Sequence, residues 1–443
     1  MKLGSYLEGR WVEGHGEGRP LVNPVSGETL AWGDSSGLDM RAAVDFARAR
    51  GAVLRDMSFA QRGALLNAVA GVLVANREKY EMLARLNSGN TKLDAAIDID
   101  GAIGTLKYYS RLGKTLGDAH IAMEAGQDQL AKDPVFFARH IWTSRSGVAI
   151  QINAFNFPSW GLWEKVAAAV LAGVPSFAKP ATATALLSHE MMRDVIAAGV
   201  APEGALNLVC GSAEGLLDAI QPMDSVAFTG SADTGLHVRS HPAVLASGAR
   251  ATIEADSVNA TILGPDSGPG TSLFDLAVRE VVKAVSVKAG QLCTNIRRVL
   301  VPRAHIGAFV EAVVSAAKAL KVGDPIDEAV RVGPVVNKKQ QAEAFAGIER
   351  LKRESRLVLG GATPAGLGGE ASAFVAPTVL VCNDPSGARV VHEIEVFGPC
   401  VTIMPYEDVA QAATLAIRGG GSLAVSLFTN DPSTIKALSL IHI

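Results

Sequence analysis

The pattern of hydrophobic and polar positions changes at about Gly147. Before that point the clearest signals are helical. Residues Ser58–Gln61 (SFAQ) have the form of a capping box and open an amphipathic run to about Leu86, and a second helical run covers roughly Thr91–Leu112. After Gly147, short β-branched or apolar runs alternate with helical segments, which is typical of a parallel sheet covered by helices.

Two sets of alternating elements are predicted. The first comprises strands at Val148–Asn153, Val174–Lys179, Leu206–Cys210 and Ser225–Thr229, with helices at Trp160–Ala172 and Leu186–Ala198. The second follows the loop Gly264–Gly270 and comprises helices at Leu273–Ala289, Ile306–Leu320 and Lys338–Glu354, with strands at Arg298–Val301 and near Val358, Val379 and Val401. We predict an α/β fold of two doubly wound units that divide between about Ala251 and Leu263, with Phe137–Trp142 as one arm of a hairpin that returns at Gly147.

Length and charge narrow the class of protein. A chain of 443 residues is longer than one ordinary core supports, which agrees with more than one unit. The 41 basic and 44 acidic residues leave a net charge of −3, so there is no electrostatic reason to expect nucleic acid or a membrane as a partner. Residues Met1–Gly14 lack the apolar region of a secretory signal, and the four cysteines show neither CxxC nor zinc spacing. A reduced, cytoplasmic compartment is the simplest expectation.

One turn has the chemistry of a phosphate site. The predicted strand Ser225–Thr229 runs into Gly230, Ser231 and, after three residues, Gly235, and a helix follows. A Gly-Ser turn at a helix N-terminus presents backbone N–H groups and the positive end of the helix dipole to a phosphate. The alternative is an ordinary strand–helix turn in which the serine caps the helix.

Cys293 is a candidate nucleophile. It lies in the segment GQLCT (290–294), just after a helix expected to end at Gly290, and Arg297 and Arg298 follow. Nearby positive charge would favour the thiolate. The alternative is that Cys293, like most single cysteines, is a small buried apolar residue.

Three further polar residues are candidates for the functional site, and each also has a purely structural interpretation. Glu254 ends an apolar run that is predicted as a strand, and a solvated carboxylate at a strand end is the alternative. Asn156 precedes Pro158 and would also suit an Asx turn, and Glu395 in EVFGP would pass for a turn residue. His237 and His241 are four apart but lack the glutamate of HExxH, so no metal site is predicted.

Taken together, these motifs resemble the aldehyde dehydrogenase superfamily. FNFP (155–158), KP (179–180), FTGS (228–231), the single Glu254, GQ-x-C (290–293) and EVFGP (395–399) follow the order and spacing of that family, from about Leu21 to the C-terminus. The sequences at 152–161, 179–184 and 254–257 are similar to those of one branch of the superfamily. That branch contains the aldehyde dehydrogenase part of the bifunctional phenylacetate-degradation enzyme and the semialdehyde dehydrogenase of aerobic benzoyl-CoA degradation. The chain departs from most of the superfamily at Ala255 and Asp256, where two glycines are usual.

The resemblance implies a role for each residue. Residues 1–253 would form a cofactor-binding domain with an oligomerisation hairpin near 136–150, and residues 254–443 a catalytic domain, incomplete at its C-terminus. The implied catalytic residues are the nucleophile Cys293, the general base Glu254 and the oxyanion donor Asn156. The implied cofactor contacts are Lys179, Thr182, Gly230, Ser231 and Gly235 at the adenosine and pyrophosphate end, and Glu395 and Phe397 at the nicotinamide end.

The cofactor is expected to be NADP rather than NAD. Many NAD-preferring relatives carry a glutamate shortly after the Lys-Pro pair, and Thr182 stands there in this chain. A carboxylate would repel a 2′-phosphate, whereas the hydroxyls of Thr182 and Thr184 beside Lys179 would accept one. The branch implies a CoA-linked semialdehyde of aromatic catabolism as substrate, its carboxylic acid as product, and a homodimer or larger homo-oligomer as the assembly.

Two other functions remain open at this stage. One is an acylating aldehyde dehydrogenase, in which coenzyme A and not water takes the acyl group from Cys293, although Glu254 favours water. The other is an inactive, truncated fragment or structural homologue. Family chains continue for several tens of residues beyond Ile443, so a poorly active chain that aggregates through an unpaired hairpin is expected.

Overall fold

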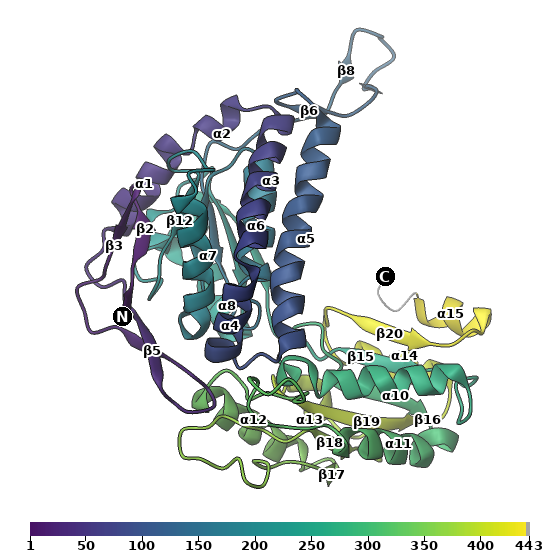
Figure 1. Ribbon diagram of the computed structural model, residues 1–443. Coiled ribbons are helices and arrows are strands. Elements are labelled where there is room, and N and C mark those ends of the chain that lie inside the picture. Colours follow the sequence, from purple (N-terminus) through teal and green to yellow (C-terminus); the bar gives the residue numbers. More distant parts are fainter. Residues whose placement is uncertain (440–443) are drawn as a thin grey trace. The chain divides into compact units, whose positions relative to one another are not determined.

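The computed structural model describes residues 1–439 and divides into two compact units, each of which is described by itself. Unit 1 consists of Met1–Leu21, Thr29–Leu83 and Ala96–Glu254. Unit 2 consists of Val22–Glu28, Ala84–Ala95 and the chain from Ala255 onward. Each unit is built on its own mixed sheet with helices on both faces, as Figure 1 shows, and the predicted α/β class is confirmed.

Unit 1 contains a seven-stranded sheet with a reversal of strand order near its centre. The order is β14 (Arg250–Glu254), β13 (Ser225–Thr229), β10 (Ala149–Ile152), β11 (Ser176–Lys179), β12 (Leu206–Leu208), β2 (Ser5–Leu7) and β3 (Arg10–Val12). The first five strands are parallel, as the alternation predicts, and β2 pairs antiparallel with β12. The chain builds outward from β10 in one direction through β11 and in the other through β13. In parallel sheets such a switch point opens a crevice at the carboxyl ends of the strands.

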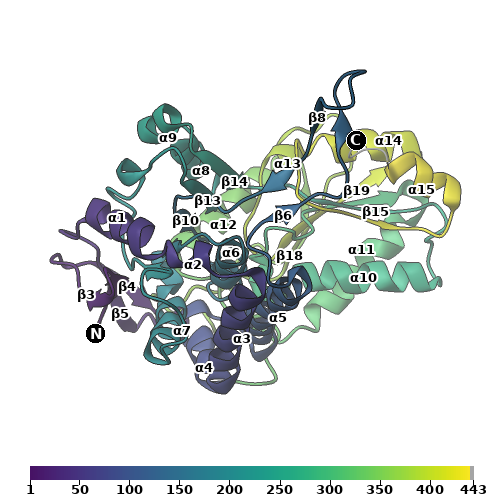
Figure 2. The same cartoon turned by 90° about the horizontal axis from the view of Figure 1, so that it is seen from above.

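Helices cover both faces of this sheet because each presents one apolar side. One face carries α1 (Met40–Arg50), α8 (Ala232–Arg239) and α9 (Pro242–Ser247), whose buried residues join one core cluster with β10 and β13. The other face carries α6 (Trp160–Leu171), with α3 (Phe59–Ala75) and α7 (Ala185–Ala197) packed beside it (Figure 2). Short α2 (Val53–Asp56) links α1 to α3.

The predicted capping box is confirmed. The Ser58 hydroxyl accepts the N–H of Gln61 at 3.3 Å, and the Gln61 side chain accepts the N–H of Ser58 at 2.8 Å. The run that follows is two helices, because α3 ends at Ala75 and α4 (Arg77–Ser88) begins after Asn76. The next predicted helix is α5 (Lys92–Leu116).

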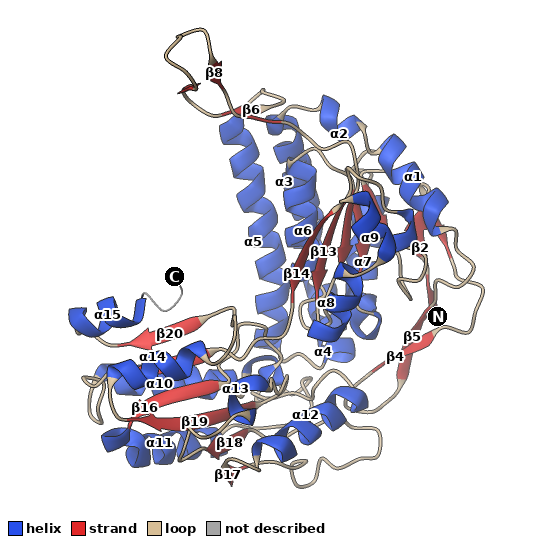
Figure 3. Ribbon diagram, turned by 180° about the vertical axis from the view of Figure 1, so that it is seen from behind, coloured by secondary structure: helices blue, strands red, loops and turns tan. Residues whose placement is uncertain are grey.

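The hairpin differs from the prediction. β9 (Ile141–Trp142) pairs with β6 (Ala122–Met123), and β8 (Phe137–Ala138) pairs with β7 (Asp128–Gln129), so the partner arm precedes Phe137–Trp142 and does not return at Gly147. A Cβ at Gly147 would overlap the backbone of Met223, so this glycine serves the entry into β10 instead. The two ladders leave the C-terminal end of α5 in Figures 1 and 3.

The strands near the N-terminus were not predicted. β1 (Lys2–Leu3), β5 (Thr29–Gly33) and β4 (Arg19–Val22) form a three-stranded sheet, and β2 and β3 extend the large sheet. They are two to five residues long, which is too short for a clear alternation of polar and apolar positions.

Unit 2 contains a six-stranded sheet in the order β17 (Arg356–Leu359), β18 (Thr378–Val381), β19 (Cys400–Tyr406), β16 (Arg298–Pro302), β15 (Ala260–Leu263) and β20 (Val425–Phe428). All neighbours are parallel except β17 and β18. One core contains side chains of α10 (Ser272–Ala284) and α11 (Ile306–Lys318), and a second contains side chains of α12 (Lys338–Leu351) and α14 (Val409–Ile417). Two short helices, α13 (Val390–Glu393) and α15 (Pro432–Ser439), complete the unit (Figure 3).

Among residues 1–439, no single helix is both long and apolar enough to cross a membrane. Only the bent pair Met40–Asp56 and Phe59–Ala75 reaches that length and composition together.

Candidate active site

The turn that carries Asn156 connects β10 to α6 in unit 1. Asn156 is buried, with 7% of its surface exposed. The first N–H groups of α6 are capped by the buried Asp98 of α5, whose carboxylate accepts from Ser159 at 3.3 Å and from Trp160 at 2.7 Å. A carboxylate at this position also interacts favourably with the positive end of the helix dipole. Asp98 was not identified from the sequence, because its partners lie more than 60 residues away.

Two hydroxyls hold the other side of this turn. Thr184 donates to the carbonyl of Phe155 at 3.0 Å, and Ser188 donates to the carbonyl of Pro158 at 2.7 Å. Thr184 is fully buried and engaged with Phe155. Because Thr184 has no exposed surface, it is not placed to contact a 2′-phosphate, whereas Thr182 is partly exposed and keeps that predicted role.

Lys179 is the last residue of β11 and is half-buried. Burial lowers the pKa of its ammonium and the nearby Arg19 lowers it further, while the Cys210 thiol acts in the opposite direction. Lys179 makes no ion pair with a carboxylate of residues 1–439, so its charge is available to an anion. Thr182 lies three residues later and donates its hydroxyl to the carbonyl of Gly211 at 3.1 Å.

The Gly230 turn connects β13 to α8. Ser231 caps α8, since its hydroxyl accepts the N–H of Thr234 at 3.4 Å, and its contact with a phosphate stays a prediction. The first turn of α8 is exposed and offers its remaining N–H groups to solvent. A Cβ at Gly235 would lie 2.8 Å from the Ile253 side chain, which explains why a residue without Cβ lets α8 approach β14.

Glu254 is the last residue of β14 and is half-buried. Its carbonyl accepts the N–H of Gly230 at 3.1 Å. Asn156, Lys179, Gly230 and Glu254 therefore all lie at or just after the carboxyl ends of neighbouring strands. This is the edge at which a doubly wound sheet binds its ligands.

The loop that carries Cys293 in unit 2 departs from the predicted helix. α10 ends at Ala284 and not at Ala289, because Lys288 and Ala289 adopt left-handed backbone conformations with φ of +49° and Gly290 has φ of +73°. Such conformations cost non-glycine residues ~1–3 kcal/mol each and persist only when the surroundings impose them. Here the buried Asp94 accepts the N–H of Lys288 at 2.8 Å.

Side chains hold the carbonyl groups of the same loop. The Cys293 carbonyl accepts from the Ser257 hydroxyl at 2.6 Å and from the Asn259 amide at 2.8 Å. The Asn295 amide donates to Ala284 at 2.8 Å and to Gly290 at 3.1 Å. The loop is therefore rigid, as a positioned nucleophile requires.

The four cysteines differ in access, and all lie in the described part of the chain. Cys293 is the one partly exposed thiol. Burial raises the pKa of Cys210 and Cys400 to about 12 and that of Cys382 to about 11, so these three thiols are protonated at neutral pH. Of the four, Cys293 alone combines access with a glycine-flanked loop.

Glu395 forms a buried ion pair with Arg297 in unit 2. The two side chains are 8% and 3% exposed, and their nitrogen and oxygen atoms are 3.0 Å apart. Burial raises the pKa of Glu395, and the charge of Arg297 lowers it. The second carboxylate oxygen accepts the N–H of Ser257 at 3.1 Å, and the ring of Phe397 lies 5.5 Å from the Arg297 guanidinium. From the sequence, Arg297 was noted only as a nearby positive charge.

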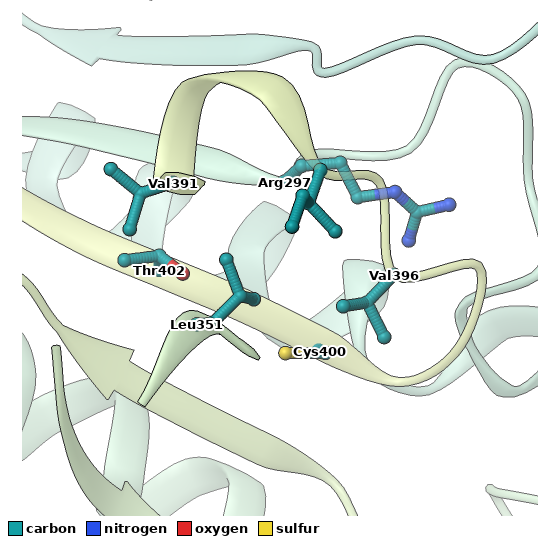
Figure 4. A pocket seen from close by; sticks show the side chains of 7 residues that line it. Arg297, Leu351, Val391, Val396, Cys400 and Thr402 are labelled. Carbon is teal, nitrogen blue, oxygen red and sulfur yellow. The ribbon is translucent and has the colours of Figure 1, made fainter. Parts of the chain in front are cut away.

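Arg297 also borders a small pocket (Figure 4). Arg297, Cys400, Thr402 and four aliphatic side chains line it, and the guanidinium lies at the Val396 end. Its volume accommodates roughly one water molecule. It is therefore too small to be an aldehyde site.

Comparisons with known proteins identify the family to which the chain belongs. Residues 11–440 match the aldehyde dehydrogenase family. The chain is 49% identical over 442 residues to 3,4-dehydroadipyl-CoA semialdehyde dehydrogenase of Aromatoleum evansii, which covers 99% of this chain and 86% of that relative. It is 27% identical to aminoaldehyde dehydrogenase 2 of Zea mays, over 99% of this chain and 85% of the relative.

Solved structures show the same fold. An NADP dependent enzyme of E. coli and a betaine aldehyde dehydrogenase of Staphylococcus aureus each match 99% of this chain with a TM-score of 0.86 and 24% identity. The match covers 88% and 85% of those chains. The chain belongs to the aldehyde dehydrogenase family and is an enzyme that oxidises an aldehyde with NAD(P).

Proposed function

We propose that this enzyme oxidises a CoA-linked semialdehyde of aromatic catabolism to the carboxylic acid, with NADP and through a thioester on Cys293. The observation that carries the catalytic part is the single accessible thiol, held on a rigid loop while the other three cysteines are buried. The substrate class is supported by the relative at 49% identity, whose name specifies a CoA semialdehyde.

In the proposed reaction the Cys293 thiolate adds to the aldehyde carbon and forms a carbon–sulfur bond. The amide of Asn156 and the backbone N–H of Cys293 donate to the resulting oxyanion, and such a donor is typically worth ~3–4 kcal/mol. The bound nicotinamide supplies the acceptor for the hydride that leaves this carbon. The product on the enzyme is then a thioester of Cys293.

Hydrolysis of the thioester requires a base. Glu254 takes a proton from water, the resulting hydroxide attacks the thioester carbon, and Cys293 leaves as a thiolate. An acylating enzyme would deliver the acyl group to coenzyme A instead. The half-buried carboxylate of Glu254 at the end of β14 favours water.

The cofactor preference is inferred from unit 1. The exposed N-terminus of α8 suits a pyrophosphate, with Gly230, Ser231 and Gly235 shaping the turn. Lys179 has no carboxylate partner within residues 1–439, and Thr182 supplies a neutral hydroxyl rather than a repelling carboxylate. We therefore infer NADP over NAD, with Glu395 and Phe397 as the contacts of the nicotinamide end.

Three broader inferences complete this proposal. Residues 1–253 bind the cofactor, and residues 254–443 carry the nucleophile. The hairpin β6–β9, with Trp142 64% exposed, supports assembly into a homodimer or larger homo-oligomer. The absence of disulfides among the four cysteines agrees with a cytoplasmic location.

The test compares Cys293→Ala, Glu254→Gln and Cys382→Ala as a control at a buried thiol. We expect Cys293→Ala to abolish NADPH formation from CoA-linked semialdehydes while cofactor binding is retained. Glu254→Gln should give a burst of about one NADPH per site followed by slow turnover, because acylation precedes the water step. Mass spectrometry of trapped enzyme should locate the acyl group on Cys293. An acyl group on another cysteine, or oxidation by Cys293→Ala, would contradict the proposal.

A further inference from the structure

The Arg297 guanidinium connects two segments of unit 2 that are about 100 residues apart in sequence. Toward the nucleophile loop it donates to the carbonyls of Gly290 at 2.9 Å and Leu292 at 3.1 Å. Toward the other segment it donates to the carbonyl of Gly398 at 3.2 Å and to one oxygen of Glu395 at 3.0 and 3.2 Å. An arginine can do this because its planar fork carries five N–H donors in fixed directions.

The Arg297 side chain contacts the proposed site groups of unit 2, which are the Cys293 loop, Glu395 and Phe397. Its partners Gly290 and Leu292 lie three residues and one residue before Cys293, and its guanidinium lies 5.5 Å from the Phe397 ring. Ser257 also connects the two segments, because its N–H donates to Glu395 and its hydroxyl donates to the Cys293 carbonyl. The loop bearing the thiol and the segment 395–398 are thus joined by two independent sets of hydrogen bonds.

We infer that Arg297 is a positioning residue for the oxidation, which holds the Cys293 loop, Glu395 and Phe397 as one rigid assembly. This inference rests on the proposed function, because it takes Cys293 as the nucleophile and Glu395 as a cofactor contact. Arg297 itself touches neither reacting atom in this scheme. Its effect is exerted through the groups it fixes.

The charge of Arg297 gives this role a pH signature. Glu395 faces two charged groups: Arg297, which lowers its pKa, and Asp256, which raises it in addition to burial. Arg297 in turn faces Glu395, Cys400 and Cys293. Removing the guanidinium leaves a buried carboxyl with only a like charge beside it, which raises its pKa further. Glu395 then becomes protonated as the pH falls, and a protonated carboxyl is a poorer acceptor for cofactor hydroxyls.

The test uses Arg297→Met and Arg297→Lys, with Arg298→Lys as a matched control. Arg298 is the next residue, equally buried, and donates to the carbonyls of Val258, Leu415 and Ala416 and to His392, none of which belongs to the proposed site. The measurements are kcat, the KM for NADP from pH 6 to 9, and the melting temperature. We expect Arg297→Met to lower kcat at least tenfold and to raise the KM for NADP more steeply than in the unmodified enzyme as the pH falls.

The two other variants separate charge from geometry. Arg297→Lys should restore the pH dependence of the KM to that of the unmodified enzyme, because the positive charge beside Glu395 is present again. It should keep a lowered kcat, because one ammonium cannot hold three carbonyls and a carboxylate. In a Glu395→Gln background, Arg297→Met should add no pH dependence to the KM for NADP, since the titrating carboxyl is absent. If Arg297→Met does not fold, the Arg297→Lys comparison of kcat and pH profile carries the test.

A merely structural Arg297 gives a different result. Arg297→Met and Arg298→Lys would then lower kcat and melting temperature in parallel without a change in the pH profile, and this would overturn the inference. A wild-type kcat in Arg297→Lys would also overturn it. Failure of the proposed function is recognised separately, since it appears in the unmodified enzyme as absence of an acyl group on Cys293.

Discussion

Replacing Asp98 with asparagine should loosen the turn that carries Asn156. The Asp98 side chain is fully buried, and its two oxygens accept the first N–H groups of α6. Asparagine has the same shape but only one acceptor oxygen. Its NH₂ group would face a backbone N–H, so one helix donor loses its partner.

The magnitude follows from these two bonds. A hydrogen bond to a charged group contributes ~1.5–3 kcal/mol, and one of the two is lost. The lost charge at the helix N-terminus adds up to ~1 kcal/mol. Part of this is offset because a neutral amide is less costly to bury than a carboxylate. A net loss of about 1–3 kcal/mol in the free energy of unfolding is therefore expected.

Activity should fall as well. A displacement of the Asn156 turn by ~1 Å would lower kcat by up to ~100-fold if Asn156 is the oxyanion donor. Binding of NADP through Lys179 should be nearly unchanged. Urea unfolding followed by tryptophan fluorescence measures the loss of stability, because Trp160 and Trp163 lie at the start of α6. Initial-rate kinetics and cofactor titration measure the others.

Asp100→Asn is the matched control on the same helix. Asp100 is 53% exposed and pairs with Arg77, and such exposed pairs are worth ~0.2–1 kcal/mol. The reasoning fails if Asp98→Asn unfolds at the same urea concentration as Asp100→Asn. It also fails if Asp98→Asn is destabilised but keeps the wild-type kcat, because the turn would then not position a catalytic group.

Two other predictions concern the cofactor and acid stability. Thr182→Glu should lower kcat/KM for NADP at least tenfold more than for NAD, because the new carboxylate repels the 2′-phosphate. A preference of the unmodified enzyme for NAD would refute the argument from Thr182. Burial lowers the pKa of His392 to about 4, and Arg298 donates to its Nδ1. Between pH 6.5 and 4 the unfolded chain therefore binds a proton that the folded chain does not, so this stabilisation is complete at neutral pH and is lost as the pH falls. The loss is about 3 kcal/mol, and urea titrations at several pH values should show a smaller acid sensitivity for His392→Gln than for the unmodified enzyme.

Local pattern was sufficient for the elements that position the site. Strands and helices alternate because buried parallel strands are short apolar runs and their crossover helices are amphipathic, and both signals are readable within about ten residues. The strand Ser225–Thr229 was predicted with its observed bounds, and the capping box at Ser58 was confirmed. Glu254 was expected at the end of a strand and Ser231 at the start of a helix, and both positions are confirmed. The roles of these site residues remain proposals.

Long-range contacts decided the rest. Asp98 caps a helix that begins 62 residues later, and Arg297 pairs with a carboxylate 98 residues away, so neither interaction leaves a local signal. The helix before Cys293 ends early because Asp94, 194 residues upstream, holds the N–H of Lys288 in a left-handed turn that the helical pattern of the segment does not favour. Periodicity reports which face of an element is apolar, whereas capping, ion pairing and backbone strain depend on partners that only the folded chain brings together.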